Sequence, residues 1–201
     1  MLTASDIRPA NVAKGLAVKR RNALTATVFG GLLTALLVEA SSFKPAGFLG
    51  GILLGVLYAN AFEYVFHRFA LHPPGRVFAQ YHLVHHSTWG TPDEPLYANF
   101  ARNPLIVVLL FTVHAVPIVV LEWVLPVGLA PGMMVGFVVY FVAYEEIHWR
   151  IHLGGWLPSW LQRARQHHLM HHAGAEGRFN VFLPLFDWLF GPSRSASRIH
   201  N

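Results

Sequence analysis

Histidine is the residue whose number and spacing indicate chemistry in this sequence. The chain has 13 histidines among 201 residues, and ten of them fall into four short groups. Neutral imidazole is the commonest metal ligand among side chains, so the pattern predicts a metal site. The groups are His67 and His72; His82, His85 and His86; His148 and His152; and His168, His171 and His172.

The spacing within the groups supports this interpretation. Residues three or four apart share one face of an α-helix, and three of the groups have that spacing. Each of these can direct two or three ring nitrogens at one point. His67 and His72 are five apart, so they converge only if the helix widens or ends near Phe69. A single histidine is more often an ordinary surface or core residue, but burying ten without partners would be costly.

Ligand type alone does not name the metal, because imidazole suits zinc, copper, iron and nickel. The sequence contains no cysteine, which excludes disulfides, thiolate haem ligation and cysteine-bound iron–sulfur clusters within this chain. Its net charge is +5. Basic charge can indicate nucleic-acid binding, but membrane topology explains it better here, and no nucleic-acid partner is expected.

Composition and hydropathy indicate a membrane protein. The chain is 54% apolar and only 12% charged, below the ~25% charged residues of a soluble domain. Uncharged stretches at residues 22–38, 46–62 and 105–121, and the core of a fourth at 132–144, are predicted to cross the membrane. We therefore predict an all-α integral membrane protein with four transmembrane helices in two hairpins. Each hairpin is followed by two of the histidine groups.

The basic residues predict the orientation of the chain. Residues 1–21 contain five basic residues and one acid, and we expect them to form a basic cytoplasmic arm that is retained rather than cleaved as a signal peptide. Residues 22–201 are predicted to form a single membrane domain. With the N-terminus inside, segments 1–21, 67–103 and 145–201 hold 14 of the 15 Lys and Arg residues. All four histidine groups then lie in a cytoplasmic, histidine-rich helical cap.

Carboxylates near the groups are candidates for holding the rings in place. A metal-bound histidine usually donates its second N–H to a carboxylate or carbonyl oxygen. Glu63 precedes His67 by four residues and Glu145 precedes His148 by three, so each pair can share a helix face. Further candidates for this role are Glu146, Asp187 and Asn180.

Two histidines outside the groups have no assigned role. His114 lies within the third predicted span. We expect it to form a hydrogen bond to a neighbouring helix, although an ionisable residue at membrane depth is also a candidate functional group. The spacing assigns no role to His167.

Three segments resemble the fatty acid hydroxylase/sterol desaturase superfamily, and fatty acid 2-hydroxylases most closely. They are EYVFHRFALH at residues 63–72, HHLMHH at 167–172 and FNVFLPLFDWLFG at 179–191. These segments are similar to the family patterns EYxxHRFLFH, HHxxHH and FGxxxxxWDxxFG. The likeness covers about residues 59–191.

The resemblance implies a non-haem di-iron centre that uses O2 to insert one oxygen atom into a C–H bond of a lipid acyl chain. Carried over by position, the iron ligands would be the ten histidines of the four groups, and zinc could replace iron in purified protein. Electrons would come from an external donor resembling cytochrome b5 or a ferredoxin, because no segment matches a fused cytochrome b5 domain. The resemblance also implies four spans beneath a cytoplasmic cap.

Two alternatives remain beside a lipid monooxygenase. The first is a sterol or carotenoid hydroxylase or desaturase of the same superfamily. Three residues separate His148 from His152, whereas carotenoid hydroxylases have four at this place, which favours the acyl branch. The second is a metal-binding or metal-transporting membrane protein. A transporter should place its ligands near the membrane midplane, but all ten histidines lie beyond the predicted span ends.

Overall fold

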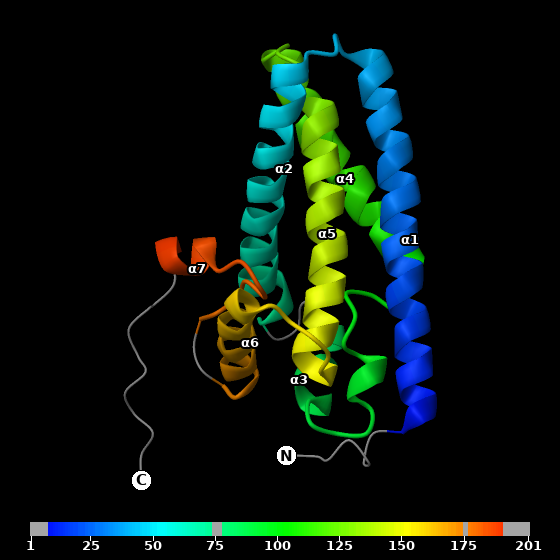
Figure 1. The fold of residues 1–201 in the computed structure, drawn as a ribbon, viewed down its shortest axis with the longest axis vertical. Helices are drawn as coiled ribbons and strands as arrows, with labels where there is room; N and C mark the ends of the chain where they lie inside the picture. The colour runs from blue at the N-terminus through cyan, green and yellow to red at the C-terminus, as the bar shows by residue number, and fades with distance from the viewer. Residues whose placement is uncertain (1–7, 74–77, 175–176, 191–201) are drawn as a thin grey trace.

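The computed structural model describes residues 8–73, 78–174 and 177–190, and this part of the chain is helical without any strand. Four of its helices are long and apolar enough to cross a membrane. This confirms the prediction of an all-helical membrane protein. Residues 1–7 of the predicted basic arm, and Gly191 at the end of the last family-like segment, lie outside the described residues. The long helices in Figure 1 are α1 (Pro9–Ala40), α2 (Pro45–Phe66), α4 (Pro104–Val124) and α5 (Ala130–Leu153).

The shorter elements gather at one end of the four-helix body (Figure 1). Three of the histidine groups belong to or directly follow these elements, and the fourth, His148 and His152, lies in the last turns of α5, so all four groups lie at the same end of the bundle. These elements are η1 (His67–Leu71), a π-helical turn that continues α2, then α3 (Ala79–Thr88), η2 (Glu94–Leu96), α6 (Ser159–His172) and α7 (Leu185–Phe190).

The first helix extends well beyond the predicted span. α1 begins at Pro9, where the missing N–H of proline costs no hydrogen bond. Most of the predicted basic arm is therefore helical and continuous with the span. The first turn of α1 also contacts the histidine end of the molecule, since Asn11 Nδ2 donates to Pro92 O and to Asp93 Oδ1, both at 2.9 Å.

The packing of the long helices differs from two separate hairpins. α5 lies between α1 and α2 (Figure 1), although α1 and α2 are consecutive in the sequence. In the most apolar window of α5, 56% of the residues are buried, against 22% or less in the other three spans. α5 is therefore the central helix, and it carries His148 and His152 at its histidine end.

Glycines explain how closely α2 approaches α5. A Cβ atom added to Gly47, Gly51 or Gly55 would lie 2.0–2.2 Å from a backbone oxygen of residues 127–133. A Cβ atom on Gly132 or Gly136 would lie 2.0–2.3 Å from a backbone oxygen of α2. No side chain fits at such distances, so these small residues allow backbone-to-backbone contact, as expected for helices that pack in lipid.

The outer surface of the bundle is apolar. Leu32, Leu53, Leu105, Val116 and Trp123 are each at least 60% exposed. Exposed apolar area of this extent suits a lipid environment and would be unfavourable in water.

Candidate metal centre

The π-helical turn η1 brings the first histidine pair together. In such a turn the hydrogen bonds run from residue i to residue i+5, so residues five apart lie on one face. The rings of His67 and His72 are stacked with their centroids 5.0 Å apart. Of the two arrangements that the spacing allowed near Phe69, a wider turn or a helix end, the structure has the wider turn.

The ten imidazoles form two groups of five. In each group, one ring nitrogen from every histidine lies within 4.8 Å of the others. The groups adjoin, because the rings of His86 and His172 stack with centroids 4.1 Å apart. Cluster 1 consists of His67, His72, His82, His86 and His171, and cluster 2 of His85, His148, His152, His168 and His172.

The two triplets of histidines are divided between the clusters. On α3, His82 and His86 face cluster 1 while His85 faces cluster 2. On α6, His168 and His172 belong to cluster 2, and His171, which lies between them in the sequence, belongs to cluster 1. Each triplet therefore directs two ring nitrogens at one point, the smaller of the two numbers that the spacing allowed. A helix face holds the residues four apart, and the middle residue points to the neighbouring cluster.

In cluster 1, one nitrogen has three close neighbours. His82 Nε2 lies 2.9 Å from His67 Nε2, 3.2 Å from His72 Nε2 and 3.0 Å from His86 Nε2. The ring nitrogen of a neutral imidazole carries either one proton or one lone pair. It can therefore form a proper hydrogen bond with only one of these neighbours. A cation that accepts a lone pair from every nitrogen accounts for the arrangement.

Cluster 2 repeats this pattern. His168 Nε2 lies 3.0 Å from His148 Nε2, 3.0 Å from His152 Nε2 and 3.2 Å from His172 Nε2. Two nitrogens bound at about 2.1 Å to one ion are about 3.0 Å apart at a right angle and about 3.4 Å apart at the tetrahedral angle. The observed distances are close to these values, so the residues of each cluster fit a single metal ion.

Hydrogen bonds fix which nitrogen of several rings faces the cluster. His67 Nδ1 bonds to the carbonyl oxygen of Phe179, and His171 Nδ1 lies 3.0 Å from the carbonyl oxygen of Gly177. A carbonyl oxygen only accepts, so each Nδ1 carries the proton and each Nε2 keeps its lone pair for a metal. Gly177 has φ +79°, a left-handed conformation that glycine adopts readily.

Glu94 holds a ring of cluster 2 in the same way. Its Oε1 lies 2.8 Å from His152 Nδ1, and its Oε2 accepts from the backbone N–H of Gly90 at 2.9 Å. Burial raises the pKa of Glu94 to about 7, with the Gly90 N–H acting in the opposite direction. Glu94 was not among the predicted residues. It begins the short element η2 and has no helical spacing to any histidine group, so no local signal identifies it.

Burial also keeps the imidazoles neutral. Desolvation lowers the pKa of His86 to about 4 and that of His171 to about 3. The pKa values of His82, His85 and His168 are also lowered well below the ordinary value of histidine, first by burial and then by the neighbouring rings. A neutral ring with a free lone pair is the form that binds a metal ion.

Glu63 acts on cluster 1 indirectly, and the expected direct contact with His67 is absent among the described residues. Its carboxylate accepts hydrogen bonds from Tyr140 Oη, from Asn180 Nδ2 at 2.9 Å and from the backbone N–H of Val181 at 2.9 Å. It therefore holds the segment that follows Phe179, whose carbonyl oxygen orients His67. Asn180 takes part through this contact rather than by bonding a ring.

Asp187 holds the same segment from the other side. It accepts from the backbone N–H groups of Phe179 at 2.8 Å and Asn180 at 2.9 Å. Its Oδ2 also lies 3.0 Å from His167 Nε2. This contact gives His167 a role that the spacing did not assign, because it ties α6 to the segment that orients His67.

The other two acids have different partners. Glu145 accepts from Asn22 Nδ2 at 2.9 Å and from the backbone N–H of Phe100 at 3.1 Å. It therefore joins α5 to α1 and to the loop before α4, and does not bond His148. Glu146 forms ion pairs with Lys19 and Arg150. Neither acid bonds a ring of either cluster within the described part of the chain.

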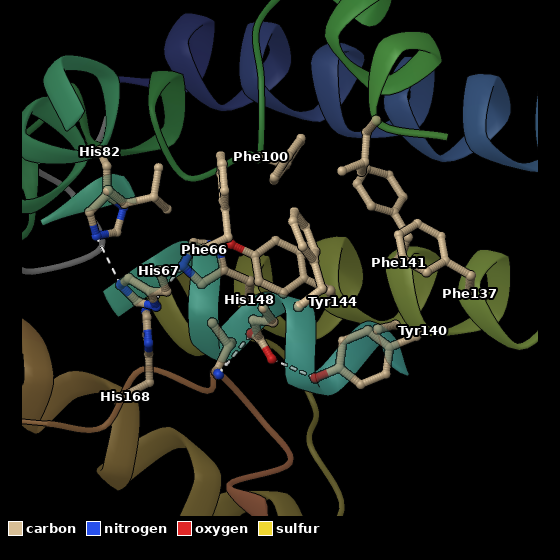
Figure 2. A pocket seen from close by; sticks show the side chains of 16 residues that line it. Phe66, His67, His82, Phe100, Phe137, Tyr140, Phe141, Tyr144, His148 and His168 are labelled. Atoms are coloured by element: carbon tan, nitrogen blue, oxygen red, sulfur yellow. Dashed lines mark hydrogen bonds between the residues drawn. The ribbon is translucent and has the colours of Figure 1, made fainter. Parts of the chain in front are cut away.

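Two adjoining cavities reach the clusters. The smaller, of about 60 Å³, is lined by rings from both clusters together with aromatic side chains. Figure 2 shows His67, His82, His148 and His168 around it, with Phe66, Phe100 and Tyr144 nearby. The larger, of about 540 Å³, begins at His82, His85 and His148 and extends along α4 past Leu109 and Val113. A molecule bound in the larger cavity would therefore have one part beside both clusters.

Comparison with known protein families agrees with this geometry. A family profile described as fatty acid hydroxylase matches residues 52–192, which include all ten clustered histidines. The chain belongs to the fatty acid hydroxylase family. This confirms the resemblance to the fatty acid hydroxylase/sterol desaturase superfamily. Searches of curated proteins and of solved structures gave no match. Membership supports a membrane-bound, lipid-modifying oxidoreductase, and the histidine clusters fit iron binding.

Proposed function

We propose that this protein is a membrane di-iron monooxygenase that hydroxylates a lipid acyl chain with O2 and electrons from an external donor. One observation carries the proposal. Two five-histidine clusters adjoin an apolar cavity of about 540 Å³ that follows α4 into the membrane-spanning part of the bundle. Cavities of this size are typical of sites for small molecules.

The ten histidines would hold two iron ions, with five nitrogens for each ion. A coordination position not filled by the protein marks a catalytic rather than a structural site. Bound iron would supply the activation of O2, which is the chemistry of the cofactor. Zinc could bind to the same nitrogens in a purified protein. The role of the chain is to keep the imidazoles neutral and oriented, and to exclude water.

The cavity lining positions the lipid. Phe66, Phe100 and Tyr144 line both cavities, and the ring of Tyr144 stacks on that of His148 with centroids 5.3 Å apart. These rings leave an apolar path from the larger cavity to the clusters. An acyl chain on this path would present its C–H bonds beside the clusters in a site with little water.

The proposed orientation places both clusters on the cytoplasmic side. The basic residues near the histidine end support it, since Lys14, Lys19, Arg20 and Arg21 lie on the early turns of α1. An electron donor dissolved in the cytoplasm, resembling cytochrome b5 or a ferredoxin, could then approach the clusters. A metal transporter is disfavoured, because a transporter places its ligands at membrane depth and every cluster histidine lies at one end of the bundle.

Lipid analysis of cells with and without the protein tests the proposal. The His82→Ala and His85→Ala variants, each lacking one proposed ligand, serve as matched controls. We expect a hydroxylated acyl lipid only in cells with the unaltered protein. A new double bond would indicate a desaturase, and a changed sterol or carotenoid would indicate the alternative substrate classes. Unchanged lipids together with metal flux in vesicles would contradict the proposal.

A further inference from the structure

A polar pair lies at the end of the larger cavity that is remote from the clusters. His114 of α4 lines this cavity, and its Nδ1 is 2.6 Å from Tyr58 Oη of α2. This bond between two spans confirms the hydrogen bond to a neighbouring helix that was expected for His114. Aromatic rings fix the imidazole, since the centroids of Phe62 and Phe137 lie 4.2 Å and 4.8 Å from its own.

The second nitrogen of His114 is available to a ligand. Among the described residues, Nε2 has no hydrogen-bond partner, and it is not one of the fully buried polar atoms that lack a partner. A polar group without a partner is costly at membrane depth. An ionisable residue there is a candidate for binding a ligand.

Nε2 of His114 can either donate one hydrogen bond into the cavity or accept one. If Tyr58 donates to Nδ1, the proton of His114 is on Nε2, which then donates into the cavity. If Nδ1 donates to Tyr58, then Nε2 is an acceptor. A hydroxyl group, which both donates and accepts, matches either arrangement, whereas a hydrocarbon chain matches neither.

The helices give the depth of this pair. Tyr58 precedes His67 by nine residues, which is about 13 Å along a helix. His67 belongs to cluster 1. The polar pair is therefore about 13 Å from that cluster, measured along α2.

We propose that the cavity selects a lipid that already carries a hydroxyl group. Nε2 of His114, whose Nδ1 is held by Tyr58, would bond this hydroxyl group while another part of the chain lies beside the histidine clusters. This rests on the proposed function and narrows its substrate class to a chain that is already oxygenated at a remote carbon. The reaction that supplies this substrate must then itself be an oxygenation or hydration of the chain.

Binding to the zinc-loaded full-length protein in lipid nanodiscs tests the assignment without turnover. The probes are one saturated fatty acid and its isomers with a hydroxyl group at successive carbons, each measured by displacement of a fluorescent fatty acid. Pairing a buried polar group that is otherwise unsatisfied changes affinity by roughly tenfold or more. We expect one isomer, or two adjacent isomers, to bind at least about tenfold more tightly than the parent acid.

Three variants decide the origin of that preference. His114→Phe keeps a ring but loses both nitrogens, so the preference should vanish while the parent acid binds at least as well. Tyr58→Phe loses only the hydroxyl group and should weaken the preference. It provides the test if His114→Phe does not fold. Thr112→Val is the control, because the Thr112 hydroxyl bonds within its own helix to Val108 O and is exposed. Its preference should equal that of the unaltered protein.

The outcomes separate this assignment from the proposed function. Equal binding of all isomers would overturn the assignment; a water molecule that stays bound to His114 would produce this result. A preference that persists in both His114→Phe and Tyr58→Phe would overturn it too. Iron content and oxygenation of the parent acid, measured in parallel, report on the proposed function alone. If no probe binds at all, both the acyl substrate and this assignment are overturned.

Discussion

Replacing Gly51 by alanine tests whether the contact of α2 with α5 positions the clusters. A Cβ atom at Gly51 would lie 2.2 Å from Leu129 O, whereas ordinary contact begins at 3.4 Å. The backbones must therefore separate by about 3.4 − 2.2 = 1.2 Å. The adjacent residue Gly50 is a matched control, because the nearest atom to its added Cβ is Leu129 Cδ2 at 3.8 Å.

The expected magnitude follows from two opposing effects. Each replacement gains about 1 kcal/mol of helix propensity relative to glycine. Only Gly51→Ala also incurs the overpacking cost, which is about 1–3 kcal/mol. Because the propensity gain is common to both, Gly51→Ala should be less stable than Gly50→Ala by about 1–3 kcal/mol.

The effect should also reach the clusters. α2 continues into η1, which carries His67, and α5 carries His148. A displacement of about 1 Å is enough to disturb a preorganised site. Unfolding titrations in mixed micelles and iron analysis of the same preparations measure both effects. Equal stability and equal iron content in the two variants would refute the idea that this contact positions the histidines.

Two further predictions concern the groups that orient the rings. Glu94→Leu removes the acceptor for His152 Nδ1 and should lower metal affinity, measured in competition with a chelator, by about 10–100-fold. The control Glu39→Gln, which alters an exposed acid, should leave the metal affinity unchanged. An unchanged affinity in Glu94→Leu would show that His152 needs no partner. Asp187→Asn weakens two backbone hydrogen bonds and should destabilise the segment around Phe179 by about 1–3 kcal/mol. It should also lower the metal content of cluster 1. A loss of metal confined to cluster 2 would contradict the role given to that segment.

Local sequence patterns were sufficient for the spans and for the choice of histidines. Uncharged stretches located the four long helices, since hydrocarbon excludes charge whatever the packing. The separation of five residues between His67 and His72 predicted a wider turn or a helix end near Phe69, because a regular α-helix does not bring such residues to one face. These features depend on chain geometry over a few residues and can be read from one sequence.

Features set by long-range packing could not be read in this way. The triplet spacing is equally compatible with one cluster or two, and only the approach of α3 to α6 assigns His85 and His171 to different clusters. Glu94 reaches His152 across 58 positions of sequence, so neither residue predicts the other. Glu63 has helical spacing to His67, but Tyr140 and Asn180 are better placed to bond it. The central position of α5 likewise depends on glycine contacts between distant helices.

Iron content per chain is the most direct measurement of the central claim. Elemental analysis and iron spectroscopy should be applied to the unaltered protein and to His82→Ala and His85→Ala, which change neighbouring positions of α3 but different clusters. The two-cluster arrangement predicts about two iron ions in the unaltered protein. It also predicts that each variant weakens a different ion, with distinguishable spectra. A single iron ion, or identical spectra from both variants, would contradict a centre built from two separate five-histidine clusters.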